Sequence, residues 1–309
     1  MRLALMIESQ EGVTWEEWVA LASACEEHGI EALFRSDHYL SSFDESRSAL
    51  DAWTTIGGLA ARTTKLELGT LVSPVTFRHP AVLARAAATA DEIASGRVTL
   101  GIGAGWMERE HAAYGFEFGT ARERVAHLGE QLEIIHRLLR EDRVDHRGDR
   151  YVLQNAPGLH RPELPLLIGG SAKPGTTGPA VRFADEYNTL FGTLTEVRER
   201  KKALDEACER AGRDPATLRY SLMAPCVLGR DQSEVHESAR RIGARFGRDS
   251  KEVLERYAER GPVGTPEQAI ERLKEIEALG YERVMLQHLE HRDLDTVALI
   301  GRELVPALT

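Results

Sequence analysis

The sequence predicts a (β/α)₈ TIM barrel, a closed ring of eight parallel strands in which each strand is followed by helical material. Short apolar runs alternate with longer amphipathic segments along the chain, a pattern typical of parallel sheets covered by helices. Eight such units in 309 residues favour a closed barrel over the alternative, an open doubly wound sheet. No linker or shift in composition divides the chain, so we expect a single domain over residues 1–309.

The expected strands are the eight short apolar runs. They cover residues 3–7, 32–34, 66–72, 98–102, 166–168, 184–190, 220–228 and 283–287. End signals mark the helices between them: Thr14 and Glu17 form a capping box, and Pro80 suits a first helical turn. We expect helices over 14–29, 52–61, 80–96, 121–139, 195–211, 233–246, 265–280 and 294–304. Residues 139–166 and 246–265 are expected to be insertions, the first with a hairpin over 144–153.

Composition excludes several classes of function. The chain has 39 Lys and Arg against 49 Asp and Glu, a net charge of -10, and no basic run, so we expect no nucleic-acid partner. No apolar run approaches the roughly 18 residues of a membrane span, so we expect no membrane association. Cys25, Cys208 and Cys226 form no CxxC pair and no disulfide framework, which fits a reducing cytoplasm.

Candidate site residues follow the strands, because the carboxyl ends of barrel strands face the active site. Asp37 and His38 come directly after the second strand. A carboxylate beside an imidazole can handle protons near neutral pH, so both are candidate catalytic residues. The structural alternative is that Asp37 caps the next turn and His38 is a packed polar residue.

Glycine-rich segments follow two further strands. Residues 101–106 read Gly-Ile-Gly-Ala-Gly-Trp, which leaves the backbone open to a ligand but has Trp106 where a dinucleotide fingerprint needs glycine. Residues 169–177 begin with Gly169 and Gly170 and carry hydroxyls and Lys173 into a helix, which suits a phosphate group. The structural alternatives are a tight turn for the first segment and a flexible loop with an ordinary helix cap for the second.

Other constellations indicate less. Glu108, Glu110 and His111 are close in sequence, but we expect them on one short helix facing solvent, and no metal site. His288 and His291 follow the last strand. Either their side chains point into the pocket, or they lie at its rim with their hydrogen bonds made by neighbouring residues. No Gly-x-Ser-x-Gly elbow is present, which argues against a serine hydrolase. Four aromatic residues have two interpretations: they line an apolar pocket, or they are part of the hydrophobic core. They are Tyr39, Trp53, Trp106 and Phe191.

Taken together, residues 32–38, 68–80, 96–106 and 167–170 resemble the luciferase-like flavin and deazaflavin oxidoreductases, in the family's order and spacing. Within that superfamily the chain is most similar to the coenzyme F420-dependent branch. The resemblance covers essentially the whole chain. It implies a luciferase-like TIM barrel with insertions, a cofactor lying across the strand ends, and a homodimer.

The resemblance also implies roles for individual positions. It places a non-prolyl cis peptide bond at Leu71–Val72, behind the cofactor ring, with Asp37 at the ring edge and His38 at proton transfer or ring contact. The implied cofactor-binding residues are Asp37, Thr70, Leu71, Val72, Gly103, Ala104, Gly105, Trp106, Gly169, Gly170 and Ser171. Lys173 and Arg35 are weaker candidates for the cofactor's acidic tail. The glucose-6-phosphate enzymes of the family carry glutamate in place of Trp106, so the resemblance does not extend to that substrate.

The sequence therefore predicts an F420-dependent oxidoreductase that moves a hydride between F420 and a small organic substrate. The alternative is an FMN-dependent luciferase-like monooxygenase served by a separate flavin reductase. A third hypothesis is a barrel that binds the cofactor without turnover, as a carrier or sensor.

Overall fold

The computed structural model describes residues 1–308, in which eight parallel strands close into a barrel. The barrel strands are β1 (Arg2–Ile7), β2 (Ala32–Arg35), β3 (Glu67–Thr70), β5 (Val98–Gly103), β8 (Leu166–Gly170), β9 (Glu186–Leu190), β10 (Arg219–Leu228) and β12 (Arg283–His288). They pair in chain order, and β12 pairs with β1 to close the ring. The predicted (β/α)₈ barrel is confirmed, and the open doubly wound sheet is excluded.

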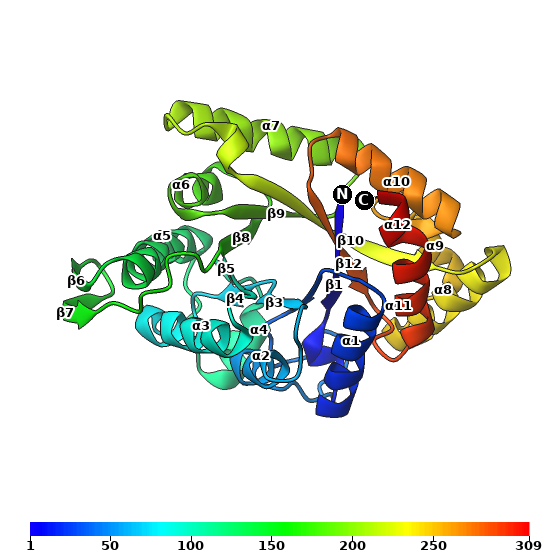
Figure 1. Ribbon diagram of the computed structural model, residues 1–309, viewed down its shortest axis with the longest axis horizontal. Helices are drawn as coiled ribbons and strands as arrows, with labels where there is room; N and C mark the ends of the chain where they lie inside the picture. The colour runs from blue at the N-terminus through cyan, green and yellow to red at the C-terminus, as the bar shows by residue number, and fades with distance from the viewer. Residues whose placement is uncertain (309) are drawn as a thin grey trace.

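Helices surround the barrel on its outside, as Figure 1 shows. They are α1 (Trp15–Glu27), α2 (Ala52–Ala60), α3 (Pro80–Ala94), α4 (Glu108–Tyr114), α5 (Ala121–Arg140), α6 (Pro174–Phe183), α7 (Leu194–Arg210), α8 (Gln232–Phe246), α9 (Ser250–Tyr257), α10 (Pro266–Ala278), α11 (Leu294–Leu299) and α12 (Val305–Leu308). The predicted capping box of Thr14 and Glu17 is confirmed at the start of α1, and Pro80 is the first residue of α3. The two ends of the chain meet, since the Met1 amino group donates to the Leu308 carbonyl at 2.6 Å.

The predicted hairpin is confirmed as an antiparallel pair, β6 (Arg143–Arg147) and β7 (Val152–Pro157). It projects from the side of the barrel beyond α5 (Figure 1). The second expected insertion, residues 246–265, contains α9 and the short strand β11 (Val263–Gly264), which pairs with β10.

Two of the expected elements are divided in the structure. The third strand was expected to reach residue 72 but ends at Thr70, and a short strand β4 (Ser73–Pro74) then pairs with β5. The two paired strands approach closely where β3 ends: a Cβ atom at Gly101 would lie 1.9 Å from the Thr70 carbonyl oxygen, and the Thr70 hydroxyl donates to the Gly101 carbonyl at 2.8 Å. The last predicted helix, 294–304, is also interrupted, because residues Ile300–Leu304 form a π-helical turn between α11 and α12.

The barrel interior is filled in two zones. Near the strand starts, the Arg283 side chain is only 2% exposed and lies among the carboxylates of Glu31, Glu67 and Glu186. Above it an apolar cluster fills the ring with Ala4, Met6, Ala32, Phe34, Leu71, Leu167, Met223 and Met285. The interior is therefore a packed core, and ligands have access only at the carboxyl ends of the strands.

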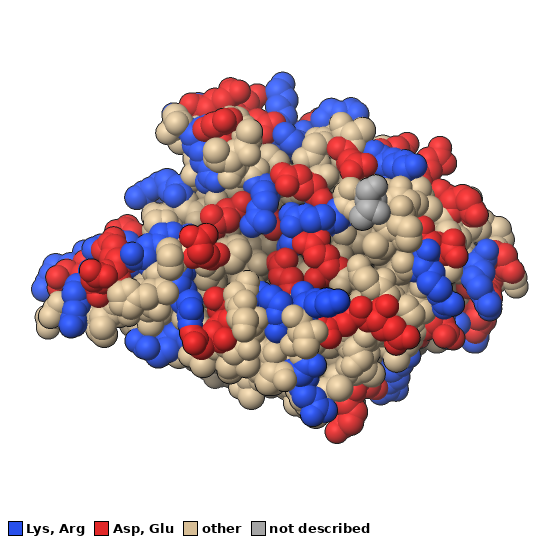
Figure 2. Space-filling model, in the orientation of Figure 1, with Lys and Arg blue, Asp and Glu red and all other residues tan. Residues whose placement is uncertain are grey.

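The surface carries both signs of charge. Figure 2 shows Lys and Arg side chains interspersed with Asp and Glu over the face in view, rather than one continuous basic area. Among the described residues, no helix is both long and apolar enough to cross a lipid bilayer. All three cysteines are buried free thiols.

Candidate active site

The predicted site residues converge because β2, β3, β5 and β8 are consecutive neighbours in the ring. Asp37 and His38 follow β2, Leu71 and Val72 follow β3, and the segment from Gly103 to Trp106 ends β5. Gly169 to Ser171 end β8. The peptide bond between Leu71 and Val72 is cis, at the position that the resemblance implies.

His38 forms a buried pair with Glu110. The His38 Nδ1 atom lies 2.8 Å from Glu110 Oε2, and the two side chains are 13% and 0% exposed. Burial by itself lowers the pKa of His38, but the hydrogen bond and negative charge of Glu110 outweigh it, so this pKa is raised. Burial in turn raises the pKa of Glu110, and the hydrogen bond and charge of His38 outweigh it, so that pKa is lowered. The pair therefore favours the charged form of both groups.

The expectation that Glu110 and His111 face solvent is wrong, because α4 packs over the barrel mouth. Glu110 accepts hydrogen bonds from the backbone N–H groups of Tyr39 and Leu40, which ties the helix to the loop after β2. His111 is 1% exposed and its Nε2 lies 2.6 Å from the Thr76 hydroxyl. Only Glu108 is exposed as predicted. Among the described residues, no group of three or more His, Cys, Asp or Glu side chains could hold a metal ion.

Asp37 is held by Arg78, a residue that the sequence analysis did not single out. The Arg78 guanidinium donates to both Asp37 oxygens, at 2.5 and 3.2 Å, and also to Asp51 at 2.7 Å. The Ser73 hydroxyl donates to Asp37 at 2.7 Å. Asp37 is 1% exposed. These contacts hold the Asp37 carboxylate in one position and occupy both of its oxygens, which leaves His38 as the better candidate for proton transfer.

Val72 occupies the space that the glycines of β5 and β8 leave open. A Cβ atom at Gly103 would lie 2.5 Å from Val72 Cγ2, and one at Gly169 would lie 2.9 Å from Val72 Cγ1. These two glycines therefore let the Val72 side chain sit between the strand ends. Val72 is half-buried and packs on the apolar cluster of the barrel interior, so it presents an apolar surface to the mouth.

The loop from β8 leads through Ala172 and Lys173 into α6. Ala172 has φ of 55°, and its backbone N–H donates to the Tyr187 hydroxyl at 3.1 Å. The N-cap residue of α6, Lys173, makes no capping hydrogen bond with its side chain. In the first turn of α6, Pro174 has no N–H, and the N–H groups of Thr176 and Thr177 donate to the Lys173 carbonyl. The exposed side chains of Ser171 and Lys173 lie beside this turn.

Some other sequence candidates lie elsewhere. Arg35 is 2% exposed and donates to the backbone carbonyls of Ser36 and Leu50, so the interpretation of Arg35 as a tail-binding residue is wrong. His288 is buried, with Nε2 bonded to the Asp293 carbonyl, and burial lowers its pKa to about 4. His288 is therefore a buried histidine with its hydrogen bond made inside the protein, and it does not line the pocket.

The four aromatic candidates divide between core and mouth. Trp53 is buried, and its indole N–H donates to Ser73. Tyr39 stacks on Phe77, and Phe191 packs on the apolar cluster inside the barrel. Trp106 is 65% exposed, with its ring 5.5 Å from the His38 ring in an edge-on contact. Trp106 therefore borders the His38–Glu110 pair from the open side.

Comparisons with known proteins agree with this architecture. An F420-dependent glucose-6-phosphate dehydrogenase of Microbacterium testaceum (strain StLB037) is 31% identical over 310 residues, which cover 92% of this chain and 90% of that protein. An F420-dependent secondary alcohol dehydrogenase, solved with an F420-acetone adduct, has a TM-score of 0.83 at 20% identity, over 100% of this chain and 99% of that chain. A coenzyme F420-dependent tetrahydromethanopterin reductase from Methanopyrus kandleri has a TM-score of 0.81 at 17% identity, over the full length of both chains.

The sequence also matches a protein family as a whole. The match extends over residues 2–283, from the first barrel strand to the start of the last, and the family is described as luciferase-like monooxygenase. The chain belongs to the luciferase-like monooxygenase family.

Proposed function

We propose that the protein is an F420-dependent oxidoreductase that moves a hydride between coenzyme F420 and a small organic substrate. The observation that carries the proposal is the buried His38–Glu110 pair at the barrel mouth, one strand away from the Val72 surface. Its dehydrogenase relative in Microbacterium testaceum and the secondary alcohol dehydrogenase of the same fold are both F420-dependent by name.

The residues at the strand ends fit such a cofactor. The apolar surface of Leu71 and Val72 suits the face of a flat ring, and the glycines of β5 and β8 allow that surface to form. The β8–α6 loop, with Ser171, Lys173 and the N-terminus of α6, suits the phosphate. When bound, F420 supplies a ring carbon that gives or accepts a hydride.

His38 then handles the proton that accompanies the hydride. Its Nδ1 is held by Glu110, which leaves Nε2 as the atom that gives a proton to a substrate oxygen or takes one from it. Glu110 fixes the orientation of the His38 imidazole and stabilises its protonated form. Asp37, held by Arg78 and Ser73, fixes the loop after β2, which would contact the cofactor when it is bound.

Titration of the purified protein with F420 and with FMN tests the cofactor. We expect saturable F420 binding, followed by changes in deazaflavin absorbance when alcohols, carbonyl compounds or sugar phosphates are added. Tight binding of FMN with no affinity for F420 would overturn the proposal and favour a monooxygenase with a separate flavin reductase. F420 binding without turnover of any substrate in a broad panel would favour a carrier or sensor.

His38→Ala tests the proton transfer. Positioned acid–base groups contribute about 10²- to 10⁴-fold to a rate, so we expect a loss of kcat in that range with F420 affinity nearly unchanged. His236→Ala is the matched control, because His236 is exposed on α8, outside the site. Unchanged turnover in His38→Ala would remove His38 from the mechanism.

The proposal includes a cytoplasmic location and a homodimer for the enzyme. Three buried free thiols fit a reducing cytoplasm. The family resemblance adds a homodimer, whose presence can be measured by light scattering.

A further inference from the structure

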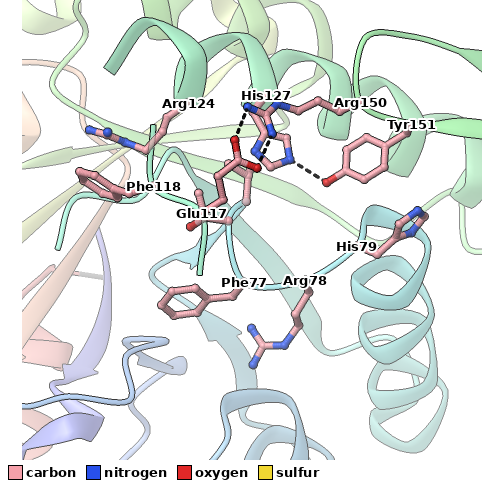
Figure 3. Close-up of a pocket in the computed structure, with 11 residues that line it drawn as sticks. Phe77, Arg78, His79, Glu117, Phe118, Arg124, His127, Arg150 and Tyr151 are labelled. Atoms are coloured by element: carbon pink, nitrogen blue, oxygen red, sulfur yellow. Dashed lines mark hydrogen bonds and ion pairs between the residues drawn. The ribbon is translucent and has the colours of Figure 1, made fainter. Parts of the chain in front are cut away.

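A cavity that the mechanism above does not use is lined in part by Arg78, the residue that holds Asp37. It has a volume of about 450 Å³ and lies between the loop leading into α3, the first turns of α5 and the hairpin (Figure 3). Arg124 and His127 of α5 line one side, and Arg150 and Tyr151 of the hairpin another. Glu117 is the only carboxylate among its lining residues.

The charge of Arg124 is not matched by a carboxylate. Its Nε and Nη1 atoms donate to the backbone carbonyls of Gly105 and Gly119, at 3.2 and 2.7 Å, and its guanidinium lies 3.8 Å from the Phe118 ring centroid. Within the described part of the chain, it forms no ion pair. A guanidinium has five N–H donors, so Arg124 can bind an anion while it keeps these contacts.

Arg150 is paired with Glu117 in an arrangement that can open. Two hydrogen bonds, at 3.2 and 3.3 Å, join the guanidinium to the two carboxylate oxygens. Glu117 is 74% exposed and Arg150 32% exposed, and exposed ion pairs contribute little to stability. Glu117 thus occupies Arg150 as the carboxylate of a ligand would, and Figure 3 shows it pointing toward the basic side chains of the cavity.

The remaining walls offer hydrogen bonds rather than charge. Burial and the positive charge of Arg150 lower the pKa of His127, whose Nε2 lies 2.6 Å from the Tyr151 hydroxyl. His79 accepts the backbone N–H of Ala81 at its Nδ1. Three arginines line the cavity, and Arg78 is already paired with Asp37 and Asp51. Arg124 and Arg150 therefore remain as the cations for a ligand, beside the hydrogen-bonding groups of His127 and Tyr151, which suits a flexible chain bearing carboxylates.

The cavity is next to the proposed phosphate site. Arg124 bonds the carbonyl of Gly105, in the loop after β5. The following residue, Val125, faces α6: a Cβ atom at Gly175 would lie 3.3 Å from Val125 Cγ1. The first turn of α5 thus separates the N-terminus of α6 from the cavity, and a chain that continues from a phosphate at α6 can cross it.

We propose that this cavity binds the carboxylate-rich tail of F420, with Arg150 exchanging Glu117 for a tail carboxylate and Arg124 as the second cation. The inference rests on the proposed function. A free polycarboxylate has the same chemistry, and the experiment below separates the two sources.

Affinities for three ligands test the proposal, measured by fluorescence titration. The ligands are F420 with its oligoglutamate tail, the same cofactor without glutamates, and the deazaflavin chromophore without phosphate or tail. One charge-assisted contact corresponds to about a tenfold change in Kd, so we expect the wild type to prefer the tailed form by about that factor or more. Arg150→Gln should lower the preference by about that tenfold factor, with Arg124 left as the remaining cation, and should not change the affinity for the two shorter ligands. Equal affinity of the wild type for tailed and untailed F420 would overturn the proposal.

Glu117→Gln is the sharper variant, because the expected effect has the opposite sign. Removing the competing carboxylate frees Arg150, so the affinity for tailed F420 should rise while that for the chromophore stays constant. Arg240→Gln is the control, since Arg240 forms an exposed pair with Glu237 on α8, far along the chain from the cavity. Weaker binding of tailed F420 by Glu117→Gln would contradict the assignment. So would a loss of preference for tailed F420 in Arg240→Gln as large as the loss in Arg150→Gln.

A last arm separates this inference from the proposed function. If no deazaflavin binds, the proposed function fails, and the tail assignment fails with it. The cavity is then probed with free tri-γ-glutamate by calorimetry on wild type and Arg150→Gln. Binding that depends on Arg150 supports a polycarboxylate site with a free ligand as the source, and absence of binding overturns the site altogether.

Discussion

At the residue scale, the proposed mechanism depends on a contact between His38 and Glu110. They are 72 positions apart in the chain, and their atoms meet at 2.8 Å. Because Glu110 also accepts two backbone N–H groups, its carboxylate is ionised and oriented before any substrate arrives. Glu110 is thus a positioning residue that acts through the imidazole.

Glu110→Gln should therefore change a pH profile as well as a rate. The amide removes the negative charge that raises the pKa of His38, so burial then lowers that pKa. The limb of the pH–rate profile that reports His38 should move to lower pH, and the His38 titration seen by NMR should move with it. A reduced kcat with an unshifted limb would mean that Glu110 supports α4 without tuning His38.

At the element scale, the ends of β5 and β8 are built around Val72. The sequence suggested that glycines there leave backbone open to a ligand, but at Gly103 and Gly169 the space belongs to the Val72 side chain. The strand ends thus create an apolar surface indirectly, by letting a neighbouring element approach.

Gly103→Ala should disturb that surface. Its methyl group would meet Val72 Cγ2 at 2.5 Å, and overpacking of this kind costs about 1–3 kcal/mol. We expect a lower urea midpoint and weaker F420 binding. Gly57→Ala is the control: Gly57 lies within α2, and a Cβ there meets nothing within 4 Å, so it should gain about 0.5–1 kcal/mol. Unimpaired F420 binding in Gly103→Ala would show that the position of Val72 is unimportant.

At the scale of the whole molecule, one arginine joins distant parts of the barrel. Arg283 begins β12, and its guanidinium lies 2.8 Å from Glu31, 2.7 Å from Glu67 and 3.4 Å from Glu186. These carboxylates precede β2, begin β3 and begin β9. The ion cluster therefore ties together strands from both halves of the ring at its starting end.

Arg283→Met should destabilise the fold, because it leaves the buried carboxylate of Glu186 and the partly buried one of Glu67 without their cation. Breaking a buried ion pair from one side costs about 3–5 kcal/mol, so the urea unfolding midpoint should fall clearly. Arg240→Met, at an exposed pair on α8, should leave the midpoint unchanged. Equal midpoints for Arg283→Met and the wild type would show that the cluster adds nothing to stability.

The sequence by itself determined the order and approximate bounds of the barrel elements. The signals that predict these elements act within a few residues, so they can be interpreted without knowledge of the fold. They are the spacing of apolar residues, capping residues such as Thr14, and prolines such as Pro80 at helix starts. The segments that match the family also placed His38, Val72 and the glycine loops at the strand ends.

Only the tertiary structure decided which of those groups work together. The burial of Glu110, the Arg78 clamp on Asp37, the sequestration of Arg35 and the Val72 contacts all join residues from different barrel units. Hydrophobic periodicity and helix-capping residues carry no information on such pairs of residues. The interaction energy of these pairs arises only when closure of the barrel brings the strand ends together and excludes water from the contacts. The charge state of His38 belongs to this level, since burial and Glu110 set it jointly.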